Sequence, residues 1–477
     1  MVKVRVEVDS LGNISLPDDV YYGIQTQRAI DNFDVSGKAM DEFSIFIASI
    51  AGIKKAAALA NKDIGRLSEK QCRAICKAAD EVIAGKMGRQ FPVDIFQGGG
   101  GTSTNMNVNE VIANRATELL TGQKGYDPIH PNTHVNMGQS TNDVIPAAMK
   151  MATYKELERV ETSLGYALTI LQEKEAAFVD VIKLGRTCLQ DALPMTLGQM
   201  FSGYRASVER QIETIRKARE LMLELPLPAT AIGTCFGTFP GFEPALYKHL
   251  GDVTGVPFQR ETNLWDGLQN ADVWIQVSAC LKSVASVFNK LSSDLRLMSS
   301  GPRAGFNEIN LPAVQPGSSI MPGKINPVMP EMMMQVAFKV FGNDLSVSLA
   351  ADRGELDLNV WESLILNCVS ESITLLEKGI VLLTDRCLRG ITANREKCAE
   401  DAGSSLALST VLATLFDYPV ASGIAKMACK ENTTIKEIVI REGLLSQERA
   451  ELLLNPANLI DINVFDHVVK GMGADNG

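Results

Sequence analysis

The stretch ADVWIQVSACLKSVASVFNKLSSDLRLMS, residues 271–299, decides the fold class. Its large apolar side chains recur at steps of three and four, which is the spacing of one face of an α-helix. The members of this row are Val273, Val277, Leu281, Val284, Phe288, Leu291 and Leu295. A second row of apolar and small residues follows another face, at Ile275, Ala279, Ser286 and Leu297. A helix of about 30 residues is about 45 Å long, so the pattern predicts an elongated helix covered on more than one face.

The same spacing covers four further stretches, at about residues 146–177, 194–225, 330–351 and 356–383. Five such helices predict an all-α fold with a central long five-helix bundle. Strand patterns are scarce, and only about residues 2–8 alternate. We expect three domains: a mixed helical domain at 1–140, the long-helix bundle at 141–392, and a small helical domain at 393–477.

Composition excludes several classes of function. The net charge of −10 argues against nucleic acid or an anionic membrane surface as the main partner. We see no apolar stretch that we expect to span a bilayer and no signal-peptide segment, so we expect a cytoplasmic protein. The nine cysteines form no CxxC pair, and there are only four histidines, so we expect neither a disulfide framework nor a catalytic zinc ion. No GxGxxG motif follows a strand, and we expect no cofactor.

The run GSSIMPGKINP, residues 317–327, predicts a loop that carries candidate catalytic and substrate-binding groups. Two Gly and two Pro in eleven residues cannot continue a helix or a central strand. Two hydroxyls open the run, and Lys324 and Asn326 close it. A proton acceptor, a carboxylate clamp and backbone N–H donors are what proton removal beside a carboxylate requires. The alternatives are an ordinary polar surface turn and a phosphate-binding loop, but Ile325 stands where the latter needs Ser or Thr.

Two more motifs accompany this loop. They are GTSTNMN at 101–107 and HVN leading to QSTND at 134–143, while the loop itself continues to Pro330 and Glu331. Together the three motifs closely resemble the signature regions of the aspartase/fumarase superfamily, and the resemblance covers about residues 10–400. It implies a homotetramer whose active sites combine residues from three subunits, acting on a small amino acid.

The chemistry can be reasoned from the residues. Removing an α-amine from a carboxylic acid requires taking a proton from the β carbon, which leaves an enediolate with two negative charges. Preorganised donors must stabilise that intermediate. The resemblance implies that Ser318 is the catalytic base, helped by loop N–H groups and Lys324. The substrate-binding residues that it implies are Thr102, Ser140, Thr141, Asn142, Thr187, Cys188, Ser319, Met321, Lys324 and Asn326.

Specific roles follow from the same resemblance. Lys324 and Asn326, assisted by Thr187, would hold the α-carboxylate. The hydroxyls of Thr102, Ser140, Thr141 and Ser319 would face the enediolate, and Asn142 would contact the amine.

Some of these residues also have plain structural explanations. Residues 140–142 precede an apolar helix and form a good N-cap sequence. Glu331 follows Pro330 at a helix start, where it would complement the helix dipole. His134 is expected to be structural.

The chain departs from the family pattern at three places. Cys188 stands where hydratases have His, and a thiol is a poor partner for proton relay with Glu331. Cys235 and Gly237 replace the family's usual Gly and Asn. The stretch at 412–418 also differs from the usual pattern.

The leading prediction is a carbon–nitrogen lyase that converts L-aspartate to fumarate and ammonia. The alternative is a lyase of the same scaffold that expels another amine, such as trimethylamine from a betaine, because a methylated cation prefers apolar and aromatic surfaces. Fumarate hydratase is less favoured, since Cys188 replaces its His. A helical scaffold without activity is a fourth possibility.

Overall fold

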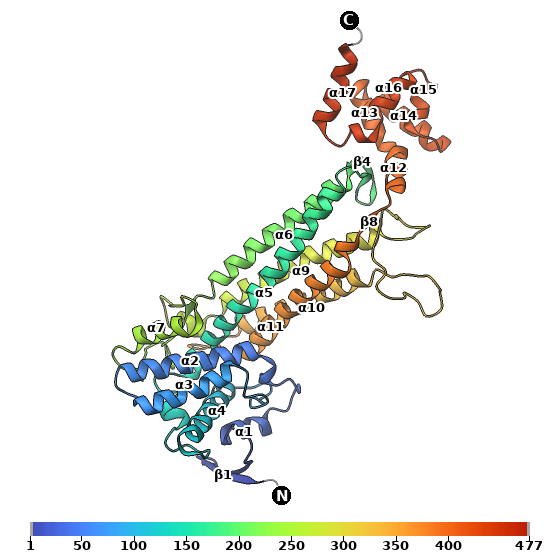
Figure 1. The fold of residues 1–477 in the computed structure, drawn as a ribbon. Coiled ribbons are helices and arrows are strands. Elements are labelled where there is room, and N and C mark those ends of the chain that lie inside the picture. Colours follow the sequence, from blue (N-terminus) through green and yellow to red (C-terminus); the bar gives the residue numbers. More distant parts are fainter. Residues whose placement is uncertain (1–2, 475–477) are drawn as a thin grey trace. The chain divides into compact units, whose positions relative to one another are not determined.

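A computed structural model describes residues 3–474 (Figure 1). Two compact units divide the chain. Unit 1 combines the described residues up to Thr162 with Glu213–Ala285 and Phe338–Glu377. Unit 2 combines Ser163–Ile212, Ser286–Ala337 and the described residues from Lys378 onward. Each unit is discontinuous in sequence, so the expected division at about residues 140 and 392 stays a prediction.

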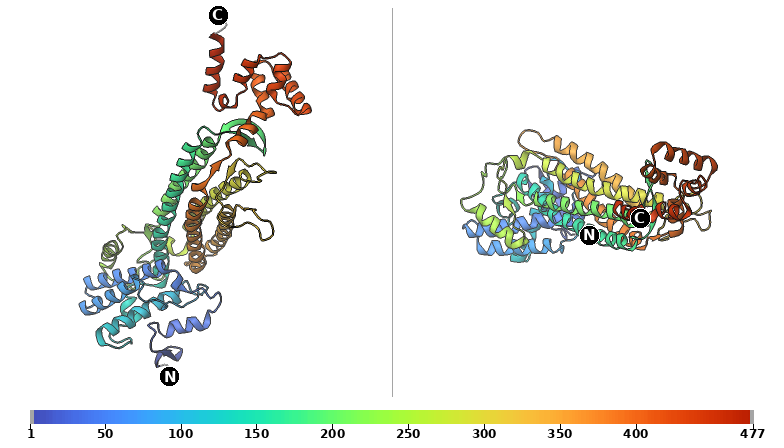
Figure 2. Two further views of the ribbon diagram at one scale, coloured as in Figure 1. Left: turned by 45° about the vertical axis from the view of Figure 1, so that its right-hand side comes forward. Right: turned by 90° about the horizontal axis from the view of Figure 1, so that it is seen from above.

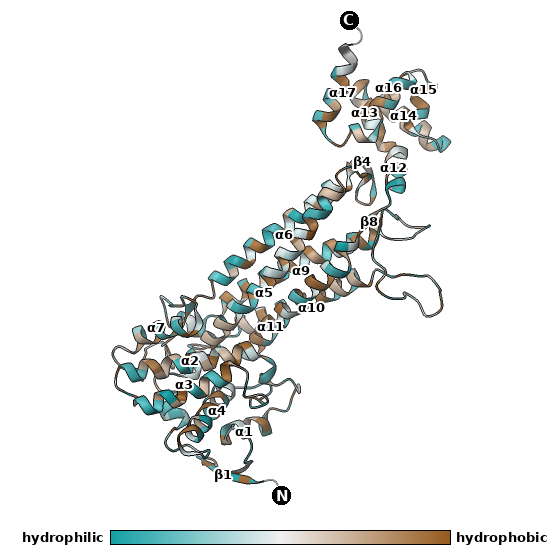
Figure 3. Ribbon diagram, in the orientation of Figure 1, coloured by the Kyte–Doolittle hydropathy of each residue, from teal (hydrophilic) through white to brown (hydrophobic). Residues whose placement is uncertain are grey.

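Five long helices confirm the all-α fold class. They are α5 (Thr141–Ala177), α6 (Leu197–Glu220), α9 (Asp272–Met298), α10 (Val328–Asp352) and α11 (Glu362–Arg386), and each contributes residues to both units. Hydrophilic and hydrophobic residues alternate along them (Figure 3). The apolar row expected for α9 is buried from Val277 to Leu295. Within unit 1, the hydroxyl of Ser278 on α9 donates to Asp344 on α10 at 2.8 Å.

Unit 1 also holds a layer of shorter helices. Here α2 (Ser44–Asp63) packs against α3 (Glu69–Ile83) and α7 (Phe242–Thr254), and α3 packs against α4 (Thr102–Thr121). The blue helices of this layer lie side by side in both views of Figure 2. By length and hydropathy alone, α2 could cross a membrane, but 72% of its apolar window is buried in the structure. We therefore interpret α2 as a core helix.

The remaining elements are short. Unit 1 contains β1 (Val4–Asp9), β2 (Gly12–Pro17), α1 (Ile24–Asn32), a π-helical turn (Pro131–Val135), β5 (Glu224–Leu225), β6 (Gln259–Arg260) and α8 (Asp266–Gln269). Unit 2 contains β3 (Ile182–Thr187), β4 (Gln190–Thr196), β7 (Ile309–Asn310), β8 (Thr392–Ala393), α12 (Arg395–Ser404), α13 (Ser409–Leu415), α14 (Tyr418–Glu431), α15 (Ile435–Arg441), α16 (Gln447–Leu453) and α17 (Ile462–Ala474). Single 3-10 turns lie at Met40–Glu42, Leu388–Gly390, Leu406–Leu408 and Pro456–Asn458.

The short helices at the C-terminal end surround their own apolar cluster. Its buried members include Leu412, Ile424, Ile438 and Leu453, which come from four different helices. This arrangement agrees with the short helices expected after about residue 393.

The β3–β4 hairpin contradicts one prediction from the sequence. We expected a helix from about residue 194, but residues 190–196 form a strand and α6 begins at Leu197. The hairpin is a two-stranded ribbon, so Pro194 stands at an edge where its missing N–H is tolerated. Gly185 allows the strands to approach, because a Cβ there would lie 2.6 Å from the carbonyl oxygen of Leu193.

Candidate active site

The glycine run before α4 sets the position of the first motif. Gly101 has φ +79°, and a Cβ there would lie 2.9 Å from Cγ1 of Ile145. Only glycine fits both the left-handed backbone and the close contact. Thr102 begins the helix and is exposed, and its hydroxyl donates to the carbonyl oxygen of Gly99 at 2.8 Å.

The second motif forms the start of α5. The Ser140 hydroxyl accepts the backbone N–H of Asn142 at 3.3 Å, and the Ser140 N–H donates to Oδ1 of Asp143 at 2.9 Å. The N-cap interpretation of Ser140 therefore holds beside any role in binding. The Thr141 hydroxyl accepts from Nδ2 of Asn105 at 3.1 Å. Since Asn105 lies in the first turn of α4, this contact brings the first two motifs together.

Asn142 and Asp143 attach the start of α5 to a neighbouring loop. The Asn142 amide donates to the carbonyl oxygen of Ala231 at 2.8 Å, which leaves its Oδ1 as an acceptor. The other oxygen of Asp143 accepts the N–H of Thr230 at 2.8 Å. Burial raises the pKa of Asp143 to about 7, although the hydrogen bonds from the backbone N–H groups of Ser140 and Thr230 act to lower it. Asp143 lies within the second motif, but the sequence alone indicates no role for it.

His134 lies in the π-helical turn before this motif. Its Nδ1 accepts the backbone N–H of His130 at 2.8 Å. Burial, followed by the neighbouring His130, lowers the pKa of His134. A neutral ring that accepts a backbone N–H fits a structural role.

The loop at 317–327 belongs to unit 2 and carries Ser318. The Ser318 Oγ accepts the backbone N–H of Met321 at 3.0 Å and that of Ile320 at 3.3 Å. Two N–H donors on one oxygen favour its ionised form. This geometry can support Ser318 as a base, which stays a prediction.

The same loop is closed at its ends. The N–H of Gly317 donates to the carbonyl oxygen of Lys324 at 2.8 Å, and Nδ2 of Asn326 donates to the carbonyl oxygen of Gly317 at 2.8 Å. A Cβ on Gly317 would lie 2.5 Å from that Lys324 oxygen. Ser319, Met321 and Lys324 are exposed, so the loop, which is closed at its two ends, presents their side chains to solvent.

Thr187 and Cys188 lie at the tip of the β3–β4 hairpin. Thr187 pairs with Gln190, and the two residues between them, Cys188 and Leu189, have φ of +53° and +59°. Positive φ at both central residues is typical of a type I′ turn. The turn exposes Thr187 and Cys188 to solvent.

Glu331 lies in the first turn of α10, where the sequence placed it. It forms a long ion pair of 3.7 Å with Arg296 of α9, and both side chains are partly exposed. An exposed pair of this length contributes little to stability.

The departures at Cys235 and Gly237 have local structural roles. Cys235 has φ +58° and packs against a small apolar cluster that includes Ala229 and Leu264. Burial raises its pKa, so it is expected to remain a thiol. Gly237 has φ +100°, a conformation that an Asn side chain would adopt only with strain. Phe236, which lies between them, is 90% exposed.

The expected site residues therefore fall into two groups. Thr102, Ser140, Thr141 and Asn142 belong to unit 1, where Asn105 joins the two motifs. Thr187, Cys188, Ser318, Ser319, Met321, Lys324 and Asn326 belong to unit 2. The combination of the two groups in one site stays a prediction.

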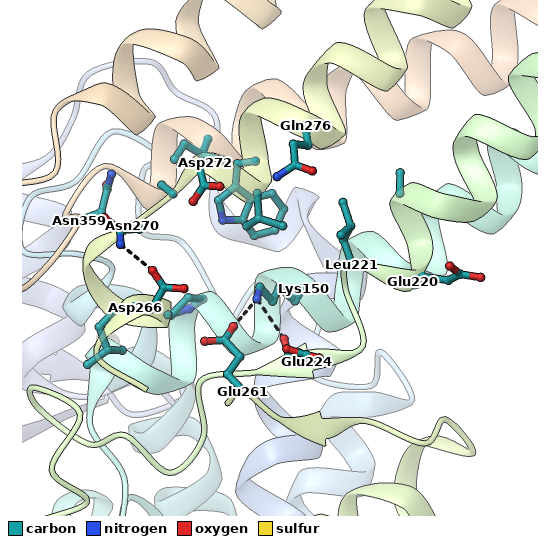
Figure 4. Close-up of a pocket in the computed structure, with 18 of the residues that line it drawn as sticks. Lys150, Glu220, Leu221, Glu224, Glu261, Asp266, Asn270, Asp272, Gln276 and Asn359 are labelled. Atoms are coloured by element: carbon teal, nitrogen blue, oxygen red, sulfur yellow. Dashed lines mark hydrogen bonds and ion pairs between the residues drawn. The ribbon is translucent and has the colours of Figure 1, made fainter. Parts of the chain in front are cut away.

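A separate pocket of about 700 Å³ lies within unit 1 (Figure 4). Lys150 lies in it and forms an ion pair with Glu261, and it also donates to the carbonyl oxygen of Glu224 at 3.0 Å. Asn270 donates to Asp266 at 2.6 Å on another wall. No residue that the sequence predicted for the site lines this pocket. The pocket is therefore separate from the predicted site, whose place at the loops and helix starts stays a prediction.

No metal site is evident in residues 3–474, since no three His, Cys, Asp or Glu side chains are grouped to hold an ion.

Comparison with known proteins places this geometry in a family. Residues 12–342 match a family model described as lyase, and residues 408–461 match one described as the fumarase C C-terminus. The chain belongs to this lyase family. That assignment confirms the superfamily resemblance inferred from the three motifs.

Several relatives span nearly the whole chain. The aspartate ammonia-lyase of Helicobacter pylori is 46% identical over 97% of this chain and 99% of its own. That of Bacillus subtilis is 44% identical over 95% of each. Among solved structures, a fumarate lyase:delta crystallin from Brucella melitensis, bound to cobalt, is 42% identical with a TM-score of 0.94 over 96% of this chain and 100% of its own. A class II fumarase from Schistosoma mansoni is 37% identical with a TM-score of 0.93 over 96% and 99%.

Proposed function

We propose that this protein is an aspartate ammonia-lyase, which eliminates ammonia from L-aspartate to give fumarate. The observation that carries the proposal is the closed loop at 317–327, in which Ser318 Oγ accepts two backbone N–H groups. Relatives named aspartate ammonia-lyase, at 41–46% identity over almost the whole chain, support the choice of substrate.

Ser318 would begin the reaction by taking the proton from the β carbon of aspartate. The electron pair of that C–H bond moves toward the neighbouring carboxylate and forms the enediolate. Its return forms the C=C bond of fumarate while the C–N bond breaks and ammonia leaves. The backbone N–H groups of Ile320 and Met321 would stabilise the Ser318 alkoxide.

Donors on two surfaces would hold the substrate. Lys324 is exposed beside the base and would act as a point charge on the α-carboxylate. Asn326 and Thr187 would assist it. The hydroxyls of Thr102, Ser140, Thr141 and Ser319 would stabilise the enediolate, and the loss of a single donor of this kind typically costs about 3 kcal/mol.

Asn142 is suited to contact the amine. Its Nδ2 is engaged by the carbonyl oxygen of Ala231, so Oδ1 remains to accept a hydrogen bond from an ammonium group. An acceptor at this position would favour a primary amine over a trimethylated one, which has no N–H to donate.

The protein would be a homotetramer in which each active site draws on three subunits. An apolar face on the unit 1 part of α10 supports association: Phe338, Leu345 and Leu349 are 54%, 62% and 56% exposed, and their spacing of seven and four places them on one side. Light scattering would measure the size of the assembly.

Complementation tests the shared site. Ser318→Ala and Asn142→Ala should each lose turnover. Reassociated mixtures should regain part of it, because some sites then receive both native residues. No gain on mixing would contradict shared sites.

A cytoplasmic location is part of the same proposal. All nine cysteines are free thiols, as expected in a reducing compartment.

The test of the function is direct. Purified protein and L-aspartate are followed by the ultraviolet absorbance of fumarate and by ammonia release, with L-malate and a trimethylammonium betaine in parallel. The exposed Phe236 and the thiol of Cys188 favour the betaine as the second candidate. Fumarate and ammonia in equal amounts from aspartate would support the proposal. Turnover of the betaine alone would replace it with the second candidate.

A further inference from the structure

We propose that Lys54, on the buried core helix α2, is a positioning residue that acts through Asn136 and Asn105 to hold the Thr141 hydroxyl as a donor toward substrate. This inference rests on the proposed function. The hydrogen bond of Lys54 goes to Asn136, which is not a predicted substrate-binding residue, so the effect would pass along a series of hydrogen bonds within unit 1.

The series of hydrogen bonds starts at the buried amine of Lys54. Lys54 is 0% exposed in a helix of Ile and Ala residues, and its Nζ donates to Oδ1 of Asn136 at 2.8 Å. The same oxygen accepts from Nδ2 of Asn109 at 3.2 Å and from Nδ2 of Asn105 at 3.3 Å. Three donors therefore meet at one amide oxygen.

The orientation of Asn136 is fixed from its other side. Its Nδ2 donates to the carbonyl oxygen of Gln139 at 3.1 Å, so its Oδ1 faces the three donors. Without Lys54, this acceptor would lose its shortest contact, since the two amide donors lie at 3.2 and 3.3 Å.

The series of hydrogen bonds ends at Thr141, a predicted substrate-binding residue. One hydrogen of Asn105 Nδ2 reaches Asn136, and the other reaches the Thr141 hydroxyl oxygen at 3.1 Å. An amide nitrogen only donates, so the hydroxyl must accept this bond. The hydrogen of Thr141 is then free to point elsewhere, as it must if this hydroxyl is to donate to a carboxylate or an enediolate.

Burial of Lys54 is costly, and the surroundings offset only part of that cost. Burial lowers its pKa to about 7, while Asp143 acts in the opposite direction. No ion pair of Lys54 with a carboxylate is recorded among residues 3–474, although the neighbouring Lys55 pairs with Asp80 at 2.6 Å. The buried Lys54 donates its hydrogen bond to the side-chain amide of Asn136, which fits a role in orienting that amide. An apolar side chain would fill the same space at lower cost.

The test compares Lys54→Met with Lys55→Met. Methionine keeps the length and removes the donor, and Lys55 is the matched control because it lies next in the chain and pairs at the surface. We expect Lys54→Met to lower kcat for aspartate by about tenfold or more, with the melting temperature unchanged or higher. Lys55→Met should keep wild-type kcat. Unchanged kcat in a folded Lys54→Met protein would overturn the proposal.

A double-mutant cycle separates positioning from a general structural role. Thr141→Val removes the hydroxyl that the chain is proposed to orient. Adding Lys54→Met to Thr141→Val should then cost no further kcat, because no hydroxyl remains to be held. Independent, multiplying losses would overturn the proposal. If Lys54→Met does not fold, Asn105→Ala breaks the last link and must show the same lack of additivity.

Binding of succinate, a dicarboxylate that carries no amine to lose, keeps the inference independent of turnover. Calorimetry should show weaker succinate binding to Lys54→Met by about fivefold or more, and unchanged binding to Lys55→Met. Equal affinities would overturn the positioning role even if the wild type did not act on aspartate. An inactive wild type with this difference in affinity would refute the proposed function alone.

Discussion

Glu362, the first residue of α11, is expected to destabilise the protein above neutral pH. The residue is 5% exposed, and its Oε2 has no hydrogen-bond partner among the described residues. It lies beneath the glycine run before α4, where a Cβ on Gly100 would be 3.6 Å from that oxygen. Burial raises the pKa of Glu362 from 4.5 to about 7.

The sign and size of the effect follow from this pKa. Between pH 4.5 and about 7 the folded protein holds a proton that the unfolded chain has lost, so the free energy of unfolding falls as pH rises through this window. At about 1.4 kcal/mol for each pKa unit, the loss is about 3 kcal/mol once Glu362 is ionised. Glu362→Gln keeps the shape and removes the charge.

Urea unfolding of wild type and Glu362→Gln provides the assay. At about pH 5 the two proteins should agree within about 1 kcal/mol, and at about pH 8 the variant should be more stable by about 3 kcal/mol. Glu213→Gln, on an exposed face of α6, is the control and should show no such growth with pH. A difference between wild type and Glu362→Gln that does not change with pH would refute the reasoning.

Three further predictions concern the start of α4 and the predicted site. Gly101→Ala should lower the free energy of unfolding by about 2–4 kcal/mol, since it combines positive φ with a contact to Ile145, whereas Gly122→Ala, with φ +81° and open space, should lose only about 1–2 kcal/mol. Equal losses in melting experiments would show that the contact relaxes. Asp143→Asn should lower stability by about 1–3 kcal/mol, because its NH₂ would face a backbone N–H, and an unchanged urea midpoint would contradict this. Cys188→Ser should keep aspartate turnover within about threefold, far from the loss of about 10² expected for a catalytic donor, and a loss of that size would make the thiol part of the chemistry.

The long helices could be predicted because their burial leaves a direct trace in the sequence. The apolar row of α9 is continuous, and its expected bounds agree with Asp272–Met298 within one residue at each end. The apolar pattern predicts a helix from about residue 146, and α5 begins five residues earlier, at Thr141. In the structure Pro146 lies inside the helix, and its missing N–H would have bonded to the carbonyl of Asn142 in the first turn.

The β3–β4 hairpin could not be predicted from turn residues. Type I′ turns usually contain Asn-Gly or Gly-Gly, and here Cys188 and Leu189 adopt the positive φ values. The strands are short, and Pro194 in β4 argued against a strand. Only the pairing of the two strands, which is a tertiary property, compensates for these local preferences.

The residues behind the predicted site were also missed. Lys54 gave a signal, because a lysine interrupts the apolar face of an otherwise buried helix, but sequence alone does not say what it contacts. Asn105 and Asn136 lie inside the first two motifs, but the sequence alone indicates no role for them. Their bonds join segments about 30 residues apart, so they become visible only once the fold is known.

Turnover of L-aspartate by wild type and by Ser318→Ala tests the central claim most directly. We predict that the wild type releases fumarate and ammonia in equal amounts and that Ser318→Ala loses about 10²–10⁴-fold in kcat, with little change in melting temperature. Full turnover by Ser318→Ala would contradict the assignment of the base.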